Sequence, residues 1–199
     1  MTRPQRMVAL GTALGVLALS LAVDHWAWRS LSVAGIYDKD WGRMLRVMGS
    51  LVFWLPLTLA VWLERRARES QGAGRAWLLL AAPILGGGVG ELLKMLLRRE
   101  RPGLHDGEWV FRAYTDRPFD TKDLGLPSSH VVVAFAGAAV LARLFPGAAP
   151  VVYLLAAGCG LSRVLARAHF VSDSVTGALA GWAVGAVLWK WAETRTLRR

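Results

Sequence analysis

The sequence predicts an all-α integral membrane protein, a six-transmembrane-helix bundle that forms a single domain over residues 1–199. Hydrophobic residues make up 54% of the chain, and several apolar windows approach the length of about 20 residues that a membrane-spanning helix needs. Charged residues fall in the connections between these windows or at their ends, where membrane proteins place them. We therefore expect helices that cross a bilayer, joined by polar connections.

Six apolar runs carry this prediction. They cover residues 7–23, 47–63, 76–97, 129–145, 149–165 and 171–191. The first run follows two arginines as a signal peptide would, but no small-residue cleavage pattern comes after it, so we expect an uncleaved span. The segment 146–150 is typical of a tight turn between antiparallel helices. The single cysteine, Cys159, excludes an intrachain disulfide and is expected to pack in an apolar run.

Two connections differ from simple turns. The segment 24–47 alternates tryptophans and aliphatic residues with charges, which favours an interfacial amphipathic segment over a span. The segment 98–126 is polar and is predicted to be an extramembrane loop between the third and fourth helices; long loops of this kind are often lids or binding loops. Its aromatic residues fit either an interfacial lid or an ordinary aromatic belt. These residues are Trp109, Phe111, Tyr114 and Phe119.

The formal net charge of +10 points to anionic partners. The basic residues do not form a patch with interleaved aromatic residues, so nucleic acid is not an expected partner. Basic residues near the ends of the runs favour an orientation with both termini inside. The residues on that inner side are Arg3, Arg6, Arg65, Arg66, Arg68, Arg75, Arg195, Arg198 and Arg199. The opposite, outer side then holds the loop 98–126.

Three polar clusters lie at the ends of apolar runs on that outer side: KMLLRRERP (94–102), PSSH (127–130) and SRVLARAHFVSD (162–173). Ionisable residues are costly at membrane depth and indicate functional sites there. In the first cluster, helical spacing predicts that Lys94, Arg98 and Arg101 share one helix face and that the helix ends at the following proline. Cations that snorkel to the surface explain the same pattern. Glu91, one turn earlier, is predicted to pair with Lys94 or Arg98.

The other two clusters add a helix start and two histidines. Ser128 is a candidate N-cap, and a helix N-terminus binds phosphate readily through free N–H groups. His130 falls in the first turn of that helix. His169 and Asp173 are four residues apart, so the carboxylate can hold one ring nitrogen and leave the other as a nucleophile. A structural His–Asp pair is the alternative interpretation.

The remaining site questions concern Arg163, the other histidines and metals. Arg163 lies just upstream of His169 and adds a cation to the third cluster. His25 and His105 lie outside the three polar clusters and are expected at the surface. Two histidines and a carboxylate also suit a metal, as a facial triad. The surrounding lysine and arginines would repel a metal ion, so we expect no metal and no cofactor.

Taken together, the clusters resemble the three-part signature of the type 2 phosphatidic acid phosphatase family, which vanadium haloperoxidases share. The matching pattern is Lys94-x6-Arg101-Pro102, then 127–130, then Ser162-Arg163-x5-His169-x3-Asp173. The second motif of the family usually reads Pro-Ser-Gly-His, and Ser129 stands here at the glycine position. That change keeps the backbone N–H but requires a geometry that serine can adopt.

The resemblance implies a metal-independent lipid phosphatase whose substrate is a phosphorylated lipid of the bilayer. It assigns phosphate binding to Lys94, Arg101, Ser128, Ser129 and Arg163. His169 would attack phosphorus and become a phosphohistidine, Asp173 would orient it, and His130 would protonate the leaving oxygen. The family places such enzymes in the bacterial cytoplasmic (inner) membrane, and the predicted orientation turns the active site to the periplasmic side.

Three matters stay open at this level. The lipid is one of undecaprenyl pyrophosphate, phosphatidylglycerophosphate, phosphatidic acid or phosphorylated lipid A. A lipid phosphotransferase would use the same first step, and a non-enzymatic lipid-binding membrane protein is a further alternative. The sequence does not indicate an oligomeric state.

Overall fold

The computed structural model describes residues 2–68 and 73–196, and in this part the chain folds into a bundle of α-helices without a β-strand. The α-helices are α1 (Arg3–Ser30), α2 (Asp40–Val47), α3 (Leu51–Ala67), α4 (Leu78–Leu97), α5 (Ser129–Leu144), α6 (Ala149–Leu165) and α7 (Val171–Thr196). Short 3-10 helices are η1 (Ile36–Asp38), η2 (Ala73–Arg75), η3 (Pro102–Leu104) and η4 (Pro146–Ala148). Arg198 and Arg199, predicted on the inner side, lie outside the described residues.

Helices form at all six predicted apolar runs, and four of them are long and apolar enough to cross a membrane: α1, α4, α6 with its preceding 3-10 turn, and α7. The pair α2–α3 adds a fifth candidate if it is counted as one span bent by 67°. Helix α5 has 16 residues, or about 24 Å, which is shorter than the hydrocarbon core of about 30 Å. The protein is therefore an all-helical membrane protein with four or five candidate spans.

The predicted interfacial segment 24–47 is wrong in its first third. Residues 24–30 continue α1, which is 28 residues long and carries a buried aspartate, Asp24, in this part. The chain then turns through η1 and forms the short α2, whose polar and apolar residues lie on opposite faces as expected for an interfacial helix. Ser50 caps α3 by accepting a hydrogen bond from Val52 N.

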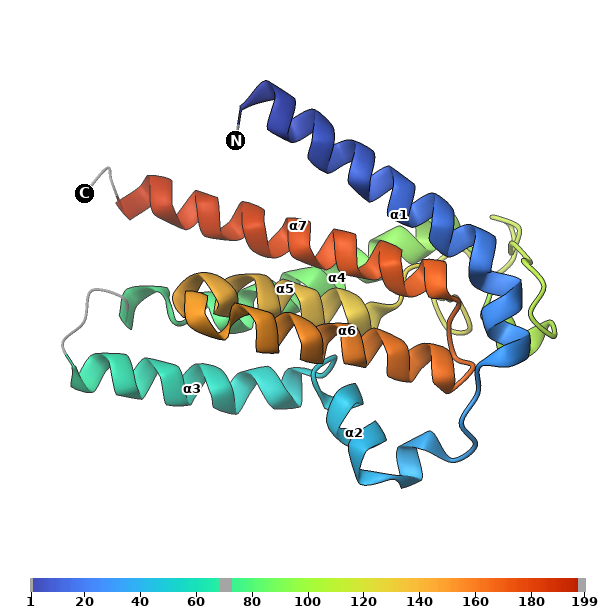
Figure 1. Ribbon diagram of the computed structural model, residues 1–199, viewed down its shortest axis with the longest axis horizontal. Coiled ribbons are helices and arrows are strands. Elements are labelled where there is room, and N and C mark those ends of the chain that lie inside the picture. The colour runs from blue at the N-terminus through green and yellow to red at the C-terminus, as the bar shows by residue number, and fades with distance from the viewer. Residues whose placement is uncertain (1, 69–72, 197–199) are drawn as a thin grey trace.

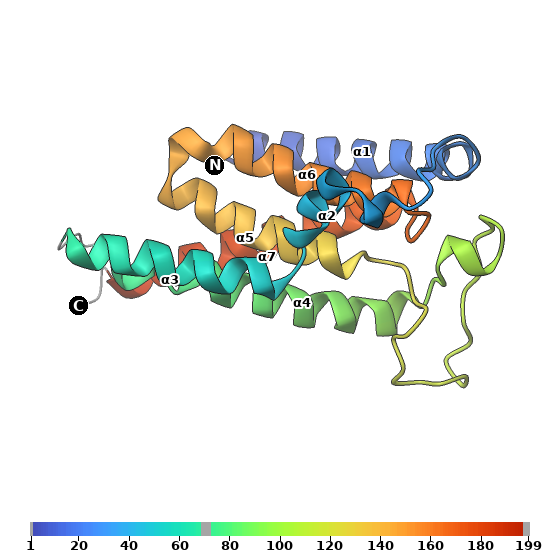
Figure 2. The same ribbon diagram turned by 90° about the horizontal axis from the view of Figure 1, so that it is seen from below.

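Helix α5 lies at the centre of the bundle, packed against α4, α6 and α7, and most of its residues are buried (Figure 2). Glycines on α7 permit this packing. A Cβ atom at Gly181 would lie 2.3 Å from the carbonyl oxygen of Val132, and one at Gly177 would lie 2.9 Å from that of Ser128. Small residues let membrane helices approach closely. The start of α5, which carries the second polar cluster, is thereby held against α7.

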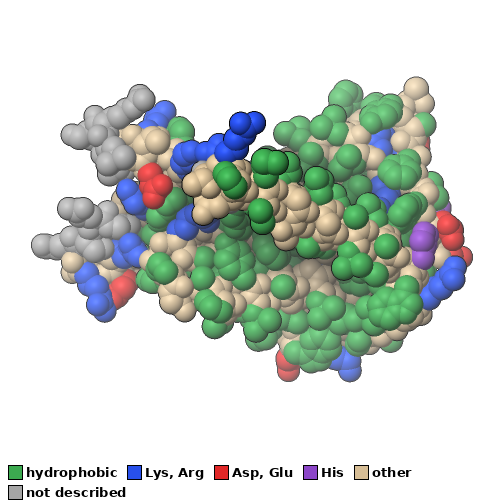
Figure 3. Space-filling model, turned by 45° about the horizontal axis from the view of Figure 1, so that its top comes forward, with side chains coloured by type: hydrophobic (Ala, Val, Ile, Leu, Met, Phe, Trp, Pro, Cys, Tyr) green, Lys and Arg blue, Asp and Glu red, His purple; other side chains and the backbone are tan. Residues whose placement is uncertain are grey.

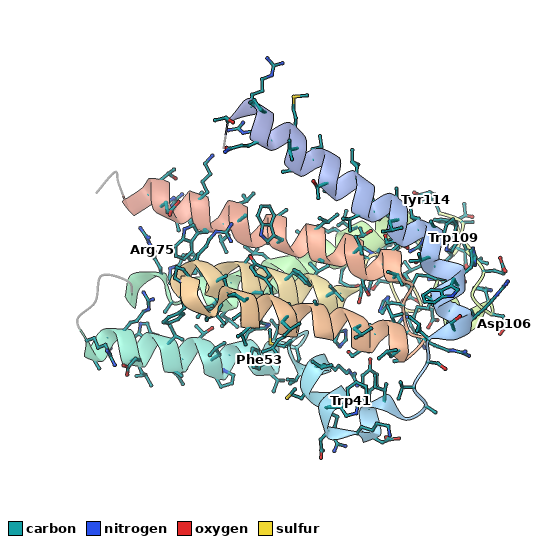
Figure 4. All side chains as sticks on the ribbon, in the orientation of Figure 1. Trp41, Phe53, Arg75, Asp106, Trp109 and Tyr114 are labelled. Atoms are coloured by element: carbon teal, nitrogen blue, oxygen red, sulfur yellow. The ribbon has the colours of Figure 1, made fainter. Side chains whose placement is uncertain are left out.

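The two ends of the bundle differ. The start of α1, the end of α3 and the end of α7 lie towards one end, and the loop between α4 and α5 lies at the other (Figure 1). In Figure 4, Arg75 marks the first end, whereas Asp106, Trp109 and Tyr114 mark the loop end. Hydrophobic side chains cover the middle of the face in Figure 3, and charged side chains gather towards both ends. This distribution is typical of a protein that crosses a bilayer along its long axis.

We predict that Gly181→Ala destabilises the bundle, because the added Cβ would clash with the backbone of α5. Overpacking of this kind costs about 1–3 kcal/mol. A thermal unfolding curve in detergent should show a lower midpoint than the wild type. Gly88→Ala is the matched control, since a Cβ there meets nothing within 4 Å. Equal midpoints for the two variants would contradict the close α5–α7 packing.

Candidate active site

The three polar clusters meet at the loop end of the bundle, because each is attached to a helix end that lies there (Figure 1). Lys94 is in the last turn of α4, and Ser128 immediately precedes α5. Arg163 is in the last turn of α6, and Asp173 is in the first turn of α7. His169 lies in the connection between α6 and α7. Residues that are up to 79 positions apart in sequence therefore line one region.

The predicted shared helix face of the first cluster is wrong. Helix α4 ends at Leu97, and Arg98 caps it with a left-handed backbone (φ 53°) instead of continuing it. Arg101 therefore comes from the extended chain after the helix, and its position does not follow from helical spacing. The helix ends four residues before Arg101, which is the last helical position that Pro102 would allow. Arg98 turns away from the helix axis and into the loop.

Arg98 and Arg112 form a polar core inside the loop. The guanidinium group of Arg98 donates to the carbonyl oxygens of Arg112, Ala113, Asp116 and Pro118. Each arginine satisfies loop carbonyls that secondary structure does not pair, so the loop has a defined path although it contains no strand. The loop is thus built around Arg98, a cation that was predicted to share a helix face with Lys94 and Arg101.

Glu100 completes this loop core. Its carboxylate accepts hydrogen bonds from Arg112 Nε at 2.7 Å and lies 2.5 Å from His105 Nε2. Burial alone would raise the pKa of Glu100, but the hydrogen bonds from His105 and Arg112 outweigh it and lower the pKa. His105 is therefore half-buried and paired. His25 is half-buried as well, with its ring 5.1 Å from that of Trp109, so neither histidine is the isolated surface residue that the sequence suggested.

His169 is buried and its ring is held at one nitrogen. Nδ1 lies 2.9 Å from the carbonyl oxygen of Gly125 and 3.5 Å from Oδ2 of Asp173. A carbonyl oxygen can only accept, so Nδ1 carries the proton and Nε2 keeps its lone pair. Burial lowers the pKa of His169, although Asp173 acts in the opposite direction. These contacts favour a neutral ring with a free lone pair on Nε2.

Three of the predicted phosphate-binding residues contain buried polar atoms without a partner. Within residues 2–68 and 73–196, no hydrogen bond is found for Nε of Arg101, Nε of Arg163 or Oγ of Ser128. Buried polar groups in proteins are nearly always paired, because an unpaired one costs about 1–3 kcal/mol. Unpaired donors that converge from three chain segments indicate a place for an anionic ligand with several oxygen atoms.

Arg163 is oriented by a residue that the sequence did not single out. Its NH1 atom donates to the hydroxyl oxygen of Tyr37 at 2.7 Å, and Tyr37 in turn donates to the carbonyl oxygen of Ser162. Tyr37 belongs to η1, which connects α1 with α2. The connection that was predicted to lie at the interface therefore contributes to the site.

Glu91 links the first two clusters. Its Oε1 atom accepts hydrogen bonds from Lys94 Nζ at 2.9 Å and from Ser129 Oγ at 2.6 Å. The predicted pairing of Glu91 with Lys94 is confirmed. Ser129 is the first residue of α5 and its φ is not positive, so the position does not require glycine. Its side chain binds Glu91, which leaves its backbone N–H as the group that can face a phosphate.

His130 completes the region from the start of α5. It is half-buried, and Lys94, Arg163 and His169 lie close enough to act on it electrostatically. The region thus holds two histidines of different surroundings, one backed by a carboxylate and one among cations. Such a difference is typical of a nucleophile and a proton donor that share one reaction.

A buried ion-pair network behind Asp173 was also missed by sequence reasoning. Arg99 NH2 donates to Oδ1 of Asp173 at 2.5 Å and to the hydroxyl of Ser172, which is bonded to Asp24. The sequence did carry a signal for Asp24, which is an acidic residue directly at the end of the apolar run 7–23. For Arg99 and Tyr37 the sequence pattern gives none.

The donor set does not suit a metal ion. The described residues contain no group of three or more His, Cys, Asp or Glu side chains that is arranged to hold one. His169 has its carboxylate partner on Nδ1, and the positive side chains of Arg101 and Arg163 face its ring. The charges that surround the histidines therefore fit an anion.

The fold and site define a membrane protein with a cluster of cationic and histidine side chains at one end of a helical bundle. The chain belongs to the PAP2 superfamily, whose model matches residues 75–197. The match includes all three polar clusters. The protein is accordingly a phosphatase, a hydrolase of phosphoric esters.

Similar proteins agree with this membership. The chain is 33% identical over 138 residues to decaprenylphosphoryl-5-phosphoribose phosphatase in two strains of Mycobacterium tuberculosis, a match that covers 68% of this chain and 69% of the relative. It also resembles the crystal structure of a transmembrane PAP2 type phosphatidylglycerolphosphate phosphatase from Bacillus subtilis. That likeness has a TM-score of 0.63 and 19% sequence identity, and it covers 91% of this chain and 94% of the other. It shows that the two share a fold.

We predict that His169 titrates below the ordinary histidine pKa of 6.5, because burial disfavours its charged form. The neutral ring should therefore persist as the pH falls through 6.5. The measurement is NMR of 15N-histidine-labelled protein in detergent, with the signal assigned by its loss in His169→Gln. A titration midpoint at or above 6.5 would contradict the described burial.

Proposed function

We propose that the protein hydrolyses a phosphate ester of a membrane lipid without a metal ion, through a phosphohistidine on His169. The observation that carries this proposal is the set of buried donors on Arg101, Ser128 and Arg163 that have no partner in the described residues. A tetrahedral phosphoryl group offers three oxygens to such donors. Fixed cations stabilise the charge that develops in phosphoryl transfer, which is the main task of a catalyst for this reaction.

In the first half-reaction, Nε2 of His169 attacks phosphorus and the bond from phosphorus to the leaving oxygen breaks. The Gly125 carbonyl holds the proton on Nδ1, and Asp173 stabilises the positive ring that forms. His130 gives a proton to the leaving oxygen. The bound phosphate offsets the positive charges around His130, which favours the protonated ring that this step needs.

In the second half-reaction, water replaces the lipid. His130, now neutral, takes a proton from the water as it attacks phosphorus. The phosphorus–nitrogen bond to His169 breaks, inorganic phosphate leaves, and the histidine returns to its neutral form. A second lipid in place of water would make the same protein a phosphotransferase, so the acceptor in this step distinguishes the two activities.

The membrane placement forms part of the proposal. We infer that α5 completes a set of six crossings, since the start of α1 and the end of α7 lie towards one end of the bundle (Figure 1). With both termini in the cytoplasm, the site opens on the periplasmic side of a bacterial inner membrane. The lipid tail then stays in the bilayer while the head group reaches the cations at the helix ends.

The names of both similar phosphatases describe lipids with two phosphates, one within the link to the lipid and one at the end of the head group. We propose that this chain acts on a lipid of the same class and removes the terminal phosphate. Arg46 of α2 is a suitable partner for the phosphate that remains. Its guanidinium carbon lies 4.6 Å from the ring centroid of Tyr37, the same ring that Arg163 approaches at 5.6 Å. Among the described residues, no carboxylate forms a salt bridge with Arg46.

We predict that His169→Ala abolishes phosphate release, because no other group in the site replaces Nε2 as nucleophile. The assay measures free phosphate from the four candidate lipids, with and without a chelator, and the wild type should remain active in the chelator. Labelled lipid with a second lipid present separates hydrolysis from transfer. Unchanged turnover by the folded His169→Ala variant would contradict the mechanism, and a wild type inert on all four lipids would support a lipid-binding role.

We predict that Arg46→Ala raises KM for phosphatidylglycerophosphate more than for phosphatidic acid, because only the first retains a phosphodiester after hydrolysis. A charge-assisted hydrogen bond contributes about 1.5–3 kcal/mol, so a rise of about tenfold is expected. Arg43→Ala is the matched control on the same helix, where the arginine pairs with Asp40. An equal effect of Arg46→Ala on both lipids would reject the role of Arg46 in substrate choice.

A further inference from the structure

Helix α1 carries a charge where a membrane helix rarely does. Asp24 is fully buried, with 0% of its surface exposed, near the loop end of this 28-residue helix. Its carboxylate accepts a hydrogen bond from Ser172 N at 2.9 Å and another from the hydroxyl of Ser172. A charge in such a place is costly unless it is paired, so its partner is informative.

That partner is Arg99, which is 1% exposed and lies between two carboxylates. Its NH1 atom is 3.7 Å from Asp24, and its NH2 atom donates to Asp173 at 2.5 Å. The rings of Phe170 and Trp109 lie 5.0 and 5.7 Å from its guanidinium carbon. The guanidinium group is therefore enclosed by aromatic rings and two acids, with Ser172 bridging between them.

The net charge of Asp24, Arg99 and Asp173 determines how much negative charge Asp173 presents to His169. Arg99 paired with Asp173 alone would cancel most of the negative charge that Asp173 presents to His169. With both carboxylates ionised, a second carboxylate on the same guanidinium leaves a net charge of −1 on the group of Asp24, Arg99 and Asp173. Charge interactions are strong in a buried region, because water does not screen them.

We propose that Asp24 is a positioning residue for the reaction, which acts through Arg99 to keep Asp173 an effective anion behind His169. This inference rests on the proposed function of His169 as the nucleophile. Asp173 receives a hydrogen bond from Phe170 N at 2.8 Å on the same oxygen that lies 3.5 Å from His169 Nδ1. Oδ2 of Asp173 is thus kept beside the His169 ring, while Oδ1 accepts the hydrogen bond from Arg99.

The charged groups around His169 explain why the net charge of Asp24, Arg99 and Asp173 matters. The charged groups that face it are Arg101 of the connection after α4, Arg163 of α6 and Asp173 of α7, with His130 of α5 nearby. All of these except Asp173 are cations or become cationic on protonation. Among these groups, only Asp173 therefore stabilises the positive charge that forms on His169 during attack. Asp24 preserves the negative charge that Asp173 presents to the ring.

A purely structural role for Asp24 is the alternative, since its bonds to Ser172 also attach α1 to α7. The two roles differ in how they respond to charge. Asp24→Asn keeps the shape of the side chain and an oxygen for Ser172 N but removes the negative charge. Ser20→Ala is the matched structural control, because Ser20 is a buried polar residue of α1 that bonds only to the carbonyl of Leu17.

The test compares five proteins by kcat, KM and the NMR titration of His169: wild type, Asp24→Asn, Arg99→Gln, the double variant and the control Ser20→Ala. For Asp24→Asn, kcat should fall about 10–100-fold, as with other residues that orient a catalytic group, while KM changes little. The titration midpoint of His169 should fall in Asp24→Asn, rise in Arg99→Gln and return towards the wild-type value in the double variant. The signs follow from the charge removed in each case.

The outcomes separate this inference from the proposed function. A midpoint of His169 that does not respond to Asp24→Asn, or a kcat equal to that of Ser20→Ala, overturns the role of Asp24. The titration requires no substrate, so it still tests Asp24 if the wild type proves inert on the lipid panel, a result that would contradict the proposed function alone. If Asp24→Asn does not fold, the double variant leaves no unpaired buried cation, and a His169 midpoint in the double variant equal to that of Arg99→Gln overturns the inference.

Discussion

The carboxylate of Asp173 is the constraint on which the rest of this site depends. It accepts the N–H of Phe170 and a guanidinium N–H of Arg99, and it lies beside the ring of His169. The backbone carbonyl of the same residue accepts a hydrogen bond from Ser128 N at 3.1 Å. One residue therefore ties the start of α7 to the start of α5, to the loop after α4 and to His169.

The helix bundle and the loop hold the partners of Asp173 in place. Glycines of α7 bring α5 into backbone contact, so the start of α5 stays at a fixed depth next to Asp173. The loop is organised around the buried Arg98, and it delivers the Gly125 carbonyl to Nδ1 of His169. The unpaired Nε atoms of Arg101 and Arg163 cost stability, and a bound phosphate would recover it. Stability and function are thus set against each other at the same atoms, as is common in active sites.

The sequence predicted the apolar runs and the meeting of the three clusters, because alternating helix directions place the ends of α4 and α6 and the starts of α5 and α7 at one face. It did not predict the path of the chain after α4. Helical periodicity placed Arg98 on the same helix face as Lys94 and Arg101, whereas its left-handed backbone sends it into the loop and leaves its neighbour, Arg99, to bind Asp173. Tyr37 was missed because its contact with Arg163 spans 126 positions and follows no local pattern.

Attack by His169 on a phosphoryl group held by fixed cations can be tested with orthovanadate, which adopts the geometry of a transferring phosphoryl group and binds as a transition-state analogue. An experimental structure of the protein with orthovanadate should show vanadium bonded to Nε2 of His169, with its oxygens contacted by Arg101, Arg163 and Ser128. Vanadate bound away from His169, or held without these three side chains, would contradict it.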